Sequence, residues 1–252
     1  YQAEKLQAFI DQEPQRLLLV KNRQDLERLL AGRQSEPARI GALLALEGVH
    51  ALEGEIANLD LLYERGFRMI GLAHFFDNEA GGSAHGRQKG GLTPFGREVV
   101  RRVAQKKMIL DLAHASGQTI EDTLDIATAP VVVSHTGVRG VCDNQRNISD
   151  DHVRAIAATG GLIGIALFEQ TVCGRTIEDT ARAMRYVADL VGVDHAALGS
   201  DYDGAVTVPM DCSGLALLTE ALLGQGFTAE EAGKIMGGNV LRLLQSALPD
   251  QD

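Results

Sequence analysis

Two stretches of the sequence decide its fold class: MILDLAH at residues 108–114 and VVVSH at residues 131–135. Both runs are apolar apart from one polar residue each, and both end on a histidine. A predominantly apolar run of this kind is typical of a strand buried on both faces of a parallel sheet. Five similar runs occur elsewhere, at residues 17–20, 41–46, 69–73, 162–167 and 196–199. The seven runs predict seven buried strands.

Segments with helix signals separate these runs. Thr93 is a suitable N-cap with Pro94 at the first helical position, and Thr228 precedes Glu231 with the spacing of a capping box. Ser149 is a further N-cap candidate, since two aspartates follow it. The alternation of strands and helices predicts the α/β class.

No linker or low-complexity tract divides the chain, so we expect one domain over residues 1–252. Two architectures fit the alternation: an open doubly wound sheet, and a TIM-type (β/α)8 barrel that is one strand short. Six of the runs end on or just before a polar residue, namely Glu47, His74, His114, His135, Glu169 or Asp201. Strand ends converge on a single rim only in a barrel, and no Gly-x-Gly-x-x-Gly motif follows the first run. The barrel is therefore favoured.

Charge and composition narrow the class of partner. The chain has 34 acidic and 24 basic residues, whereas nucleic acid is bound by clustered Lys and Arg, so we expect no nucleic-acid partner. It has no apolar stretch of about 18 residues, the length that a membrane helix needs. Three cysteines are few for this length and favour a reducing compartment such as the cytoplasm. Because the chain begins with Tyr1 rather than Met, a periplasmic or secreted location stays open.

Glu47, His114 and His135 are the candidate metal ligands. A carboxylate at a buried strand end needs a cationic partner or a metal, so a salt bridge also explains Glu47. A single strand-end histidine is usually structural, but His114 and His135 end neighbouring predicted strands. Two imidazoles and a carboxylate together form a donor set that suits zinc.

Asp201, His74, Asp77 and Arg146 complete the predicted rim. Asp201 follows a strand among glycines and is a candidate acid/base, with an Asx turn as the alternative. Arg146 offers a fork for a substrate carboxylate, although a surface ion pair with Asp150 or Asp151 is equally consistent with the sequence. Four histidines in loops or helix starts are expected to be solvated: His50, His85, His152 and His195.

A series of short motifs occurs in a fixed order along the chain. The motifs are Glu47-Gly48, Leu72–His74, Gly91–Gly96, Asp111–Ser116, Ser134-His135, Arg146-Asn147 with Asp150, and Gly199–Gly204. Together they resemble the membrane dipeptidase (renal dipeptidase) family of zinc peptidases over almost the whole chain. The resemblance implies a metallo-dependent hydrolase-like barrel, a two-zinc centre and a homodimer. Glu47 would bridge the two zinc ions, and His114 and His135 would hold one of them.

The resemblance also implies a reaction. Two zinc ions would lower the pKa of a shared water, and Asp201 would take its proton and return it to the leaving amine. His74 would stabilise the oxyanion, and Arg146 would bind the terminal carboxylate of a dipeptide. We therefore expect a zinc-dependent dipeptidase. The alternatives are a related amidohydrolase that acts on another small amide, and a catalytically silent homologue that lacks half of the metal site.

One part of the family pattern is absent from this sequence. Family members hold the second zinc with a His-x-Asp pair at the end of their first strand, and residues 1–46 contain no histidine. We expect a segment before Tyr1, the alternative being a natural short form. The sequence as it stands is expected to bind at most one zinc. The resemblance to secreted members further implies a Cys142–Cys173 disulfide, which would leave Cys212 free.

Overall fold

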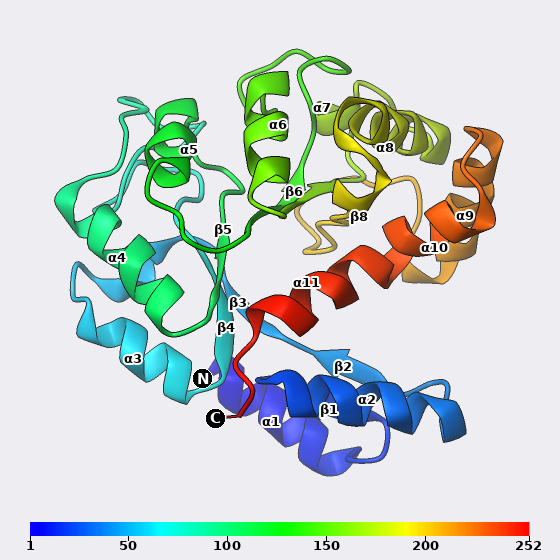
Figure 1. The fold of residues 1–252 in the computed structure, drawn as a ribbon, viewed down its shortest axis with the longest axis horizontal. Helices are drawn as coiled ribbons and strands as arrows, with labels where there is room; N and C mark the ends of the chain where they lie inside the picture. The colour runs from blue at the N-terminus through cyan, green and yellow to red at the C-terminus, as the bar shows by residue number, and fades with distance from the viewer. Residues whose placement is uncertain (252) are drawn as a thin grey trace.

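A six-stranded parallel sheet forms the centre of the protein in a computed structural model that describes residues 1–251 (Figure 1). Its strands are β3 (Leu44–Leu46), β4 (Phe67–Gly71), β5 (Ile109–Asp111), β6 (Val131–Thr136), β7 (Leu162–Ile165) and β8 (Ala196–Leu198). They lie side by side in the order in which they occur along the chain. A doubly wound sheet reverses this order at a switch point, whereas a barrel does not. The uninterrupted order confirms the predicted barrel-type α/β class.

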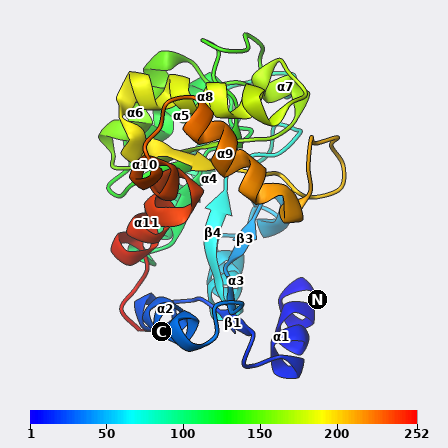
Figure 2. The same ribbon diagram turned by 90° about the vertical axis from the view of Figure 1, so that its right-hand side faces the viewer.

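The strands nearest the N-terminus form a separate small sheet. β1 (Leu17–Leu19) pairs in parallel with β2 (Ile40–Ala42), and β3 follows directly after Leu43. The predicted single strand at residues 41–46 is therefore divided, since β2 pairs with β1 whereas β3 pairs with β4. The expectation of seven strands in one barrel wall was wrong in this respect. Figure 2 shows this small sheet beneath β3 and β4, next to both chain ends.

Helices surround the central sheet, and the first two helices of the chain pack on the small sheet instead (Figure 1). They are α1 (Gln2–Gln12), α2 (Arg23–Ser35), α3 (Ala57–Glu64), α4 (Pro94–Gln105), α5 (Gly117–Leu124), α6 (Asp150–Ala158), α7 (Glu169–Val172), α8 (Ile177–Val191), α9 (Leu215–Gly224), α10 (Ala229–Gly233) and α11 (Asn239–Ala247). The predicted caps are confirmed: Thr93 accepts from the backbone of Gly96, and Thr228 and Glu231 form a capping box. None of the helices in residues 1–251 has both the length and the apolar character needed to cross a membrane.

The main apolar core lies between the sheet and the helices packed on it. Ile70, Leu110, Val133, Ile163 and Ala196 supply one buried side chain from each of five neighbouring strands. Burial of a large aliphatic side chain stabilises the fold by about 1.5–3 kcal/mol. This shared core fixes the strands relative to one another, and with them the residues at their carboxyl ends.

Two glycines allow close packing next to the carboxyl end of β6. A Cβ atom added to Gly164 or Gly199 would lie 2.1 Å from the carbonyl oxygen of Ser134. Any side chain at either position would therefore push β7 or the end of β8 away from β6. The glycines hold the polar end of β6 in a fixed position against its neighbours.

Candidate metal and catalytic site

Glu47, His114 and His135 converge at the carboxyl ends of β3, β5 and β6. The Oε1 atom of Glu47 lies 3.0 Å from Nε2 of His114 and 3.1 Å from Nε2 of His135. The two Nε2 atoms are 2.9 Å apart. The three residues predicted as metal ligands thus point at one another from three separate strand ends.

His74 and Asp201 lie at the margin of this cluster. His74 Nε2 is 3.7 Å from Oε2 of Glu47, and ligand atoms of Glu47, His74 and His114 all lie within 4.8 Å of one another. The sequence predicted His74 as an oxyanion-stabilising group, and its position is also compatible with metal binding. The Oδ1 atom of Asp201 is 3.9 Å from Nε2 of His135. All five predicted residues therefore belong to one group.

The backbone is left-handed at two of these residues. His114 has φ +62° and Asp201 has φ +60°. Residues other than glycine adopt this region at a cost of about 1–3 kcal/mol, and such strained residues are enriched at active sites. Both residues follow a strand by three positions, so the chain turns sharply where each side chain enters the cluster.

Burial and mutual contact shift the protonation equilibria of the cluster. Contacts with the His114 and His135 rings lower the pKa of Glu47, although burial acts in the opposite direction. Burial lowers the pKa of His114 to about 4, so its ring is neutral near pH 7. Burial raises the pKa of Asp201 above its ordinary value. A neutral imidazole and an ionised carboxylate are the forms that bind a metal ion.

Arg146 is buried beside the cluster, which corrects the alternative of a surface ion pair. Its side chain is 7% exposed and donates to the carbonyl oxygen of His135 at 2.6 Å. A longer contact of 3.4 Å joins it to Oγ1 of Thr136. Burial lowers the pKa of Arg146 to about 10, and nearby Asp201 opposes this shift. The guanidinium therefore remains a cation in a largely desolvated place.

A cavity of about 950 Å³ opens onto these residues. Its wall includes Glu47, His74, His114, Arg146 and Asp201. Apolar parts of the wall come from Phe75 and Phe168, and acidic parts from Asp143, Glu169 and Asp203. A cavity of this size is in the range that binds small organic ligands.

His85 is part of the cavity wall, and the prediction that it is solvated was wrong. Its ring centroid lies 5.0 Å from that of Phe75 and 5.5 Å from that of His114. Its Nε2 atom is buried and makes no hydrogen bond within the described residues. Its sequence context is the glycine-rich loop of residues 79–91, which could admit a substrate but does not by itself place His85 in the cavity wall.

Asp77 explains why this loop is held against the cavity. Its carboxylate accepts hydrogen bonds from the backbone N–H groups of Ser83, Gln88 and Lys89. The backbone N–H of Ala84 also donates to the carbonyl oxygen of His114 at 2.7 Å. The loop is therefore attached to the chain after β4 and after β5, and it keeps His85 at the cavity.

Comparison with protein families agrees with this geometry. The family model of the membrane dipeptidases (peptidase family M19) matches residues 1–249. The chain belongs to the membrane dipeptidase family. This membership confirms the resemblance that the ordered motifs indicated.

Curated relatives in the membrane dipeptidase family match most of this chain. "Dipeptidase aclJ" from Aspergillus oryzae is 34% identical over 218 residues, which cover 82% of this chain and 52% of the relative. "Dipeptidase 3" from Mus musculus is 30% identical over 229 residues, covering 82% and 44%. The chain thus spans about half the length of the curated relatives it matches.

Solved structures share the membrane dipeptidase fold seen here. The probable dipeptidase PvdM from Pseudomonas aeruginosa superposes with a TM-score of 0.89 at 20% identity, covering 97% of this chain and 77% of the other. A metallo peptidase from Rhodobacter sphaeroides, bound to a phosphinate mimic of the dipeptide L-Ala-D-Ala, gives 0.84 at 23% identity, covering 97% and 73%. At sequence identities this low, the similarity establishes that these proteins share a fold with this chain.

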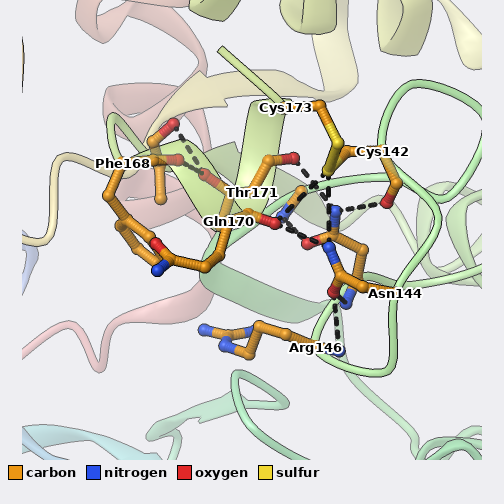
Figure 3. Close-up of a disulfide and its surroundings, with 10 residues drawn as sticks. Cys142, Asn144, Arg146, Phe168, Gln170, Thr171 and Cys173 are labelled. Carbon is orange, nitrogen blue, oxygen red and sulfur yellow. Dashed lines mark hydrogen bonds between the residues drawn. A yellow bond between two sulfur atoms is a disulfide. The ribbon is translucent and has the colours of Figure 1, made fainter. Parts of the chain in front are cut away.

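A disulfide implied by the membrane dipeptidase resemblance is present at the cavity. Cys142 and Cys173 are bonded, with their Cα atoms 5.3 Å apart, and Cys212 is free and exposed. Asn144 connects this bond with the Arg146 loop: its amide donates to the carbonyl oxygen of Gln170, and its Oδ1 accepts from the backbone N–H of Arg146 (Figure 3). The disulfide therefore belongs to the wall that positions Arg146.

Proposed function

We propose that this chain is the catalytic unit of a zinc-dependent dipeptidase. The observation that carries the proposal is the convergence of Glu47 Oε1, His114 Nε2 and His135 Nε2 within 3.1 Å of one another, beside a cavity that also holds Asp201 and a buried Arg146. Membership of the membrane dipeptidase family supports it, as do the dipeptidase names of the curated relatives.

The residues present fit a divalent cation. One carboxylate oxygen and two imidazole nitrogens form the donor set preferred by zinc, and the two Nε2 atoms are closer to each other than two lone pairs tolerate without a proton or a cation between them. His74 lies near enough to Glu47 to contribute a further nitrogen. A bound cation of this kind polarises a carbonyl group and lowers the pKa of water.

Substrate binding, proton transfer and oxyanion stabilisation are assigned to three different side chains. Arg146 supplies a fixed positive charge that binds the terminal carboxylate of a dipeptide, which limits the substrate length. Asp201 has a raised pKa and stands next to His135, so it can accept a proton from water and deliver it to the leaving amine. His74 borders the same cavity and can donate a hydrogen bond to the oxyanion.

The test uses the 252-residue chain, stripped with a chelator and then titrated with Zn²⁺. Elemental analysis is expected to find at most one zinc per chain. The loaded protein is then offered dipeptides and N-acyl amino acids, with cleavage followed by mass spectrometry. We expect cleavage of dipeptides. Cleavage of N-acyl amino acids alone would instead favour the related amidohydrolase.

Asp201→Asn provides the sharper arm of this test. It keeps the side-chain shape but cannot take up a proton, and we expect kcat to fall by about 100- to 10,000-fold. Asp203→Asn is the matched control, because Asp203 is exposed and borders the same cavity. Equal activity of the Asp201→Asn variant and the wild type would refute the assigned role, and a full-length, zinc-loaded protein that cleaves no dipeptide would refute the activity.

A further inference from the structure

Asp111 and Ser134 are two polar residues inside the apolar strands β5 and β6. Asp111 is 5% exposed, and its Oδ1 accepts from the backbone N–H groups of Ala113 at 3.0 Å and of Ser134 at 2.9 Å. Its Oδ2 accepts from the hydroxyl of Ser134 at 2.5 Å. Ser134 Oγ also lies 2.9 Å from Nδ1 of His135. The three side chains form a hydrogen-bond network that ends at the cluster of candidate metal ligands.

The number of hydrogen atoms available in this hydrogen-bond network determines which nitrogen of the His135 ring carries a proton. A serine hydroxyl has a single hydrogen, and here it is donated to Asp111. Toward His135 the hydroxyl oxygen can therefore only accept, so Nδ1 of His135 must carry a hydrogen. In a neutral imidazole the other nitrogen, Nε2, is then a bare acceptor. That atom faces Glu47 Oε1 at 3.1 Å, where two acceptors meet unless the ring is protonated or a cation lies between them.

We propose that Asp111 and Ser134 are positioning residues that set the tautomer of His135 and present its Nε2 lone pair to a metal ion. The metal-binding part of this inference rests on the proposed function, whereas the tautomer itself does not. His114 differs, because its Nδ1 is buried without a hydrogen-bond partner in the described residues. One of the two imidazoles is thus fixed by the protein, and the other is not fixed in this way.

An Asp111→Asn variant tests the direction of the hydrogen bonds in this network. The asparagine Oδ1 can still accept from the two backbone N–H groups, so its Nδ2 would face Ser134. This amide donates where the carboxylate accepted, and the Ser134 hydroxyl must then donate to Nδ1 of His135. The proton of the neutral ring is forced onto Nε2, the atom that faces the cluster. The substitution changes one atom and is expected to invert the tautomer.

The primary measurement is made on metal-free protein without substrate. Nitrogen-15 chemical shifts of the His135 ring distinguish the two tautomers. We expect Nδ1–H in the wild type, Nε2–H in Asp111→Asn, and a mixture in Ser134→Ala. Ser134→Thr keeps a hydroxyl and is expected to retain the wild-type tautomer. Asp25→Asn is the matched control, since Asp25 is a buried aspartate on α2 that accepts from the backbone N–H of Lys21.

The second measurement is competition for Zn²⁺ between the protein and a chelator. We expect Asp111→Asn and Ser134→Ala to bind zinc about 10- to 100-fold more weakly, while Asp25→Asn and Ser134→Thr bind as the wild type does. A wild-type tautomer in Ser134→Ala would overturn the inference, even if Asp111→Asn does not fold. Altered tautomers with unchanged zinc affinity would overturn the metal-positioning role. Failure of the dipeptidase assay leaves both readouts intact, so the two proposals are tested separately.

Discussion

The guanidinium of Arg146 donates a hydrogen bond of 2.6 Å to the carbonyl oxygen of His135. The proposed carboxylate-binding residue is therefore attached to the backbone of a proposed metal ligand. A movement of either residue would change the distance between the proposed binding point of the dipeptide's terminal carboxylate and the proposed site of peptide-bond cleavage. This connection makes Arg146 the first residue to test for substrate binding.

Replacement of Arg146 by Lys keeps a positive charge but removes the planar fork. We expect KM for a free dipeptide to rise at least about tenfold, with a smaller change in kcat. The matched substrate is the corresponding dipeptide amide, which has no terminal carboxylate and is expected to lose little. An equal loss on both substrates would show that Arg146 acts on the candidate metal ligands through His135 and not on the substrate carboxylate.

Replacement of His85 by Ala removes one ring from the cavity wall and leaves the Asp77 contacts of the loop in place. We expect the preference between dipeptides with small and with aromatic side chains to change by about tenfold, because a few missing atoms in a pocket alter discrimination by about 1–3 kcal/mol. His85→Phe keeps a ring and serves as the control. Identical kcat/KM ratios in His85→Ala and wild type would exclude His85 from substrate selection.

Loss of the disulfide is expected to destabilise the chain. The bond closes a loop with a sequence separation of 31, for which removal of Cys142 and Cys173 costs about 3–4 kcal/mol of unfolding free energy in the chain-entropy description. Urea unfolding of the Cys142→Ser, Cys173→Ser double variant checks this value. Cys212→Ser is the control, because Cys212 is exposed and unbonded. A loss no larger than that of the control would contradict the prediction.

Asp60 provides a test of acid stability away from the site. Its carboxylate lies 2.7 Å from Nζ of Lys106, and both of its oxygens accept from the single Nη2 atom of Arg102; Lys106 and Arg102 lower its pKa. A lowered folded-state pKa means that the stabilisation is complete above the unfolded value of about 3.9 and is lost as the pH falls through the folded value. At this exposure it amounts to no more than about 1 kcal/mol.

Asp60→Asn is therefore expected to be less stable than the wild type near neutral pH by this small amount. The difference should shrink as the solution is acidified below the ordinary carboxyl range. Unfolding curves of both proteins, recorded at several pH values, measure it. A difference that stays constant through the acid range would assign the effect to packing and not to charge.

The fold class and most of the site could be predicted from the sequence for a definite reason. Parallel strands give uninterrupted apolar runs, and a barrel gathers their carboxyl ends, so the order of residues alone groups Glu47, His114, His135 and Asp201 at one rim. The division of residues 41–46 between two sheets could not be predicted, because apolar character does not specify which neighbour a strand pairs with.

The position of His85 and the role of Asp111 could not be predicted from the sequence, for two different reasons. His85 lies at the cavity because Asp77 binds the backbone of its loop, and backbone contacts leave no residue pattern. Asp111 did leave a signal, a carboxylate inside an otherwise apolar run, but its role depends on the distance to Ser134 on the next strand. Only the geometry distinguishes a positioning group from a structural one.

The left-handed backbone at His114 and Asp201 has a consequence for how this chain can change over evolutionary time. At each position glycine would adopt this backbone conformation without strain, but it would remove a side chain of the proposed site. A related protein without catalytic activity could accept glycine at either position. A histidine and an aspartate at these two positions therefore exchange backbone stability for the side chains that the proposed function needs.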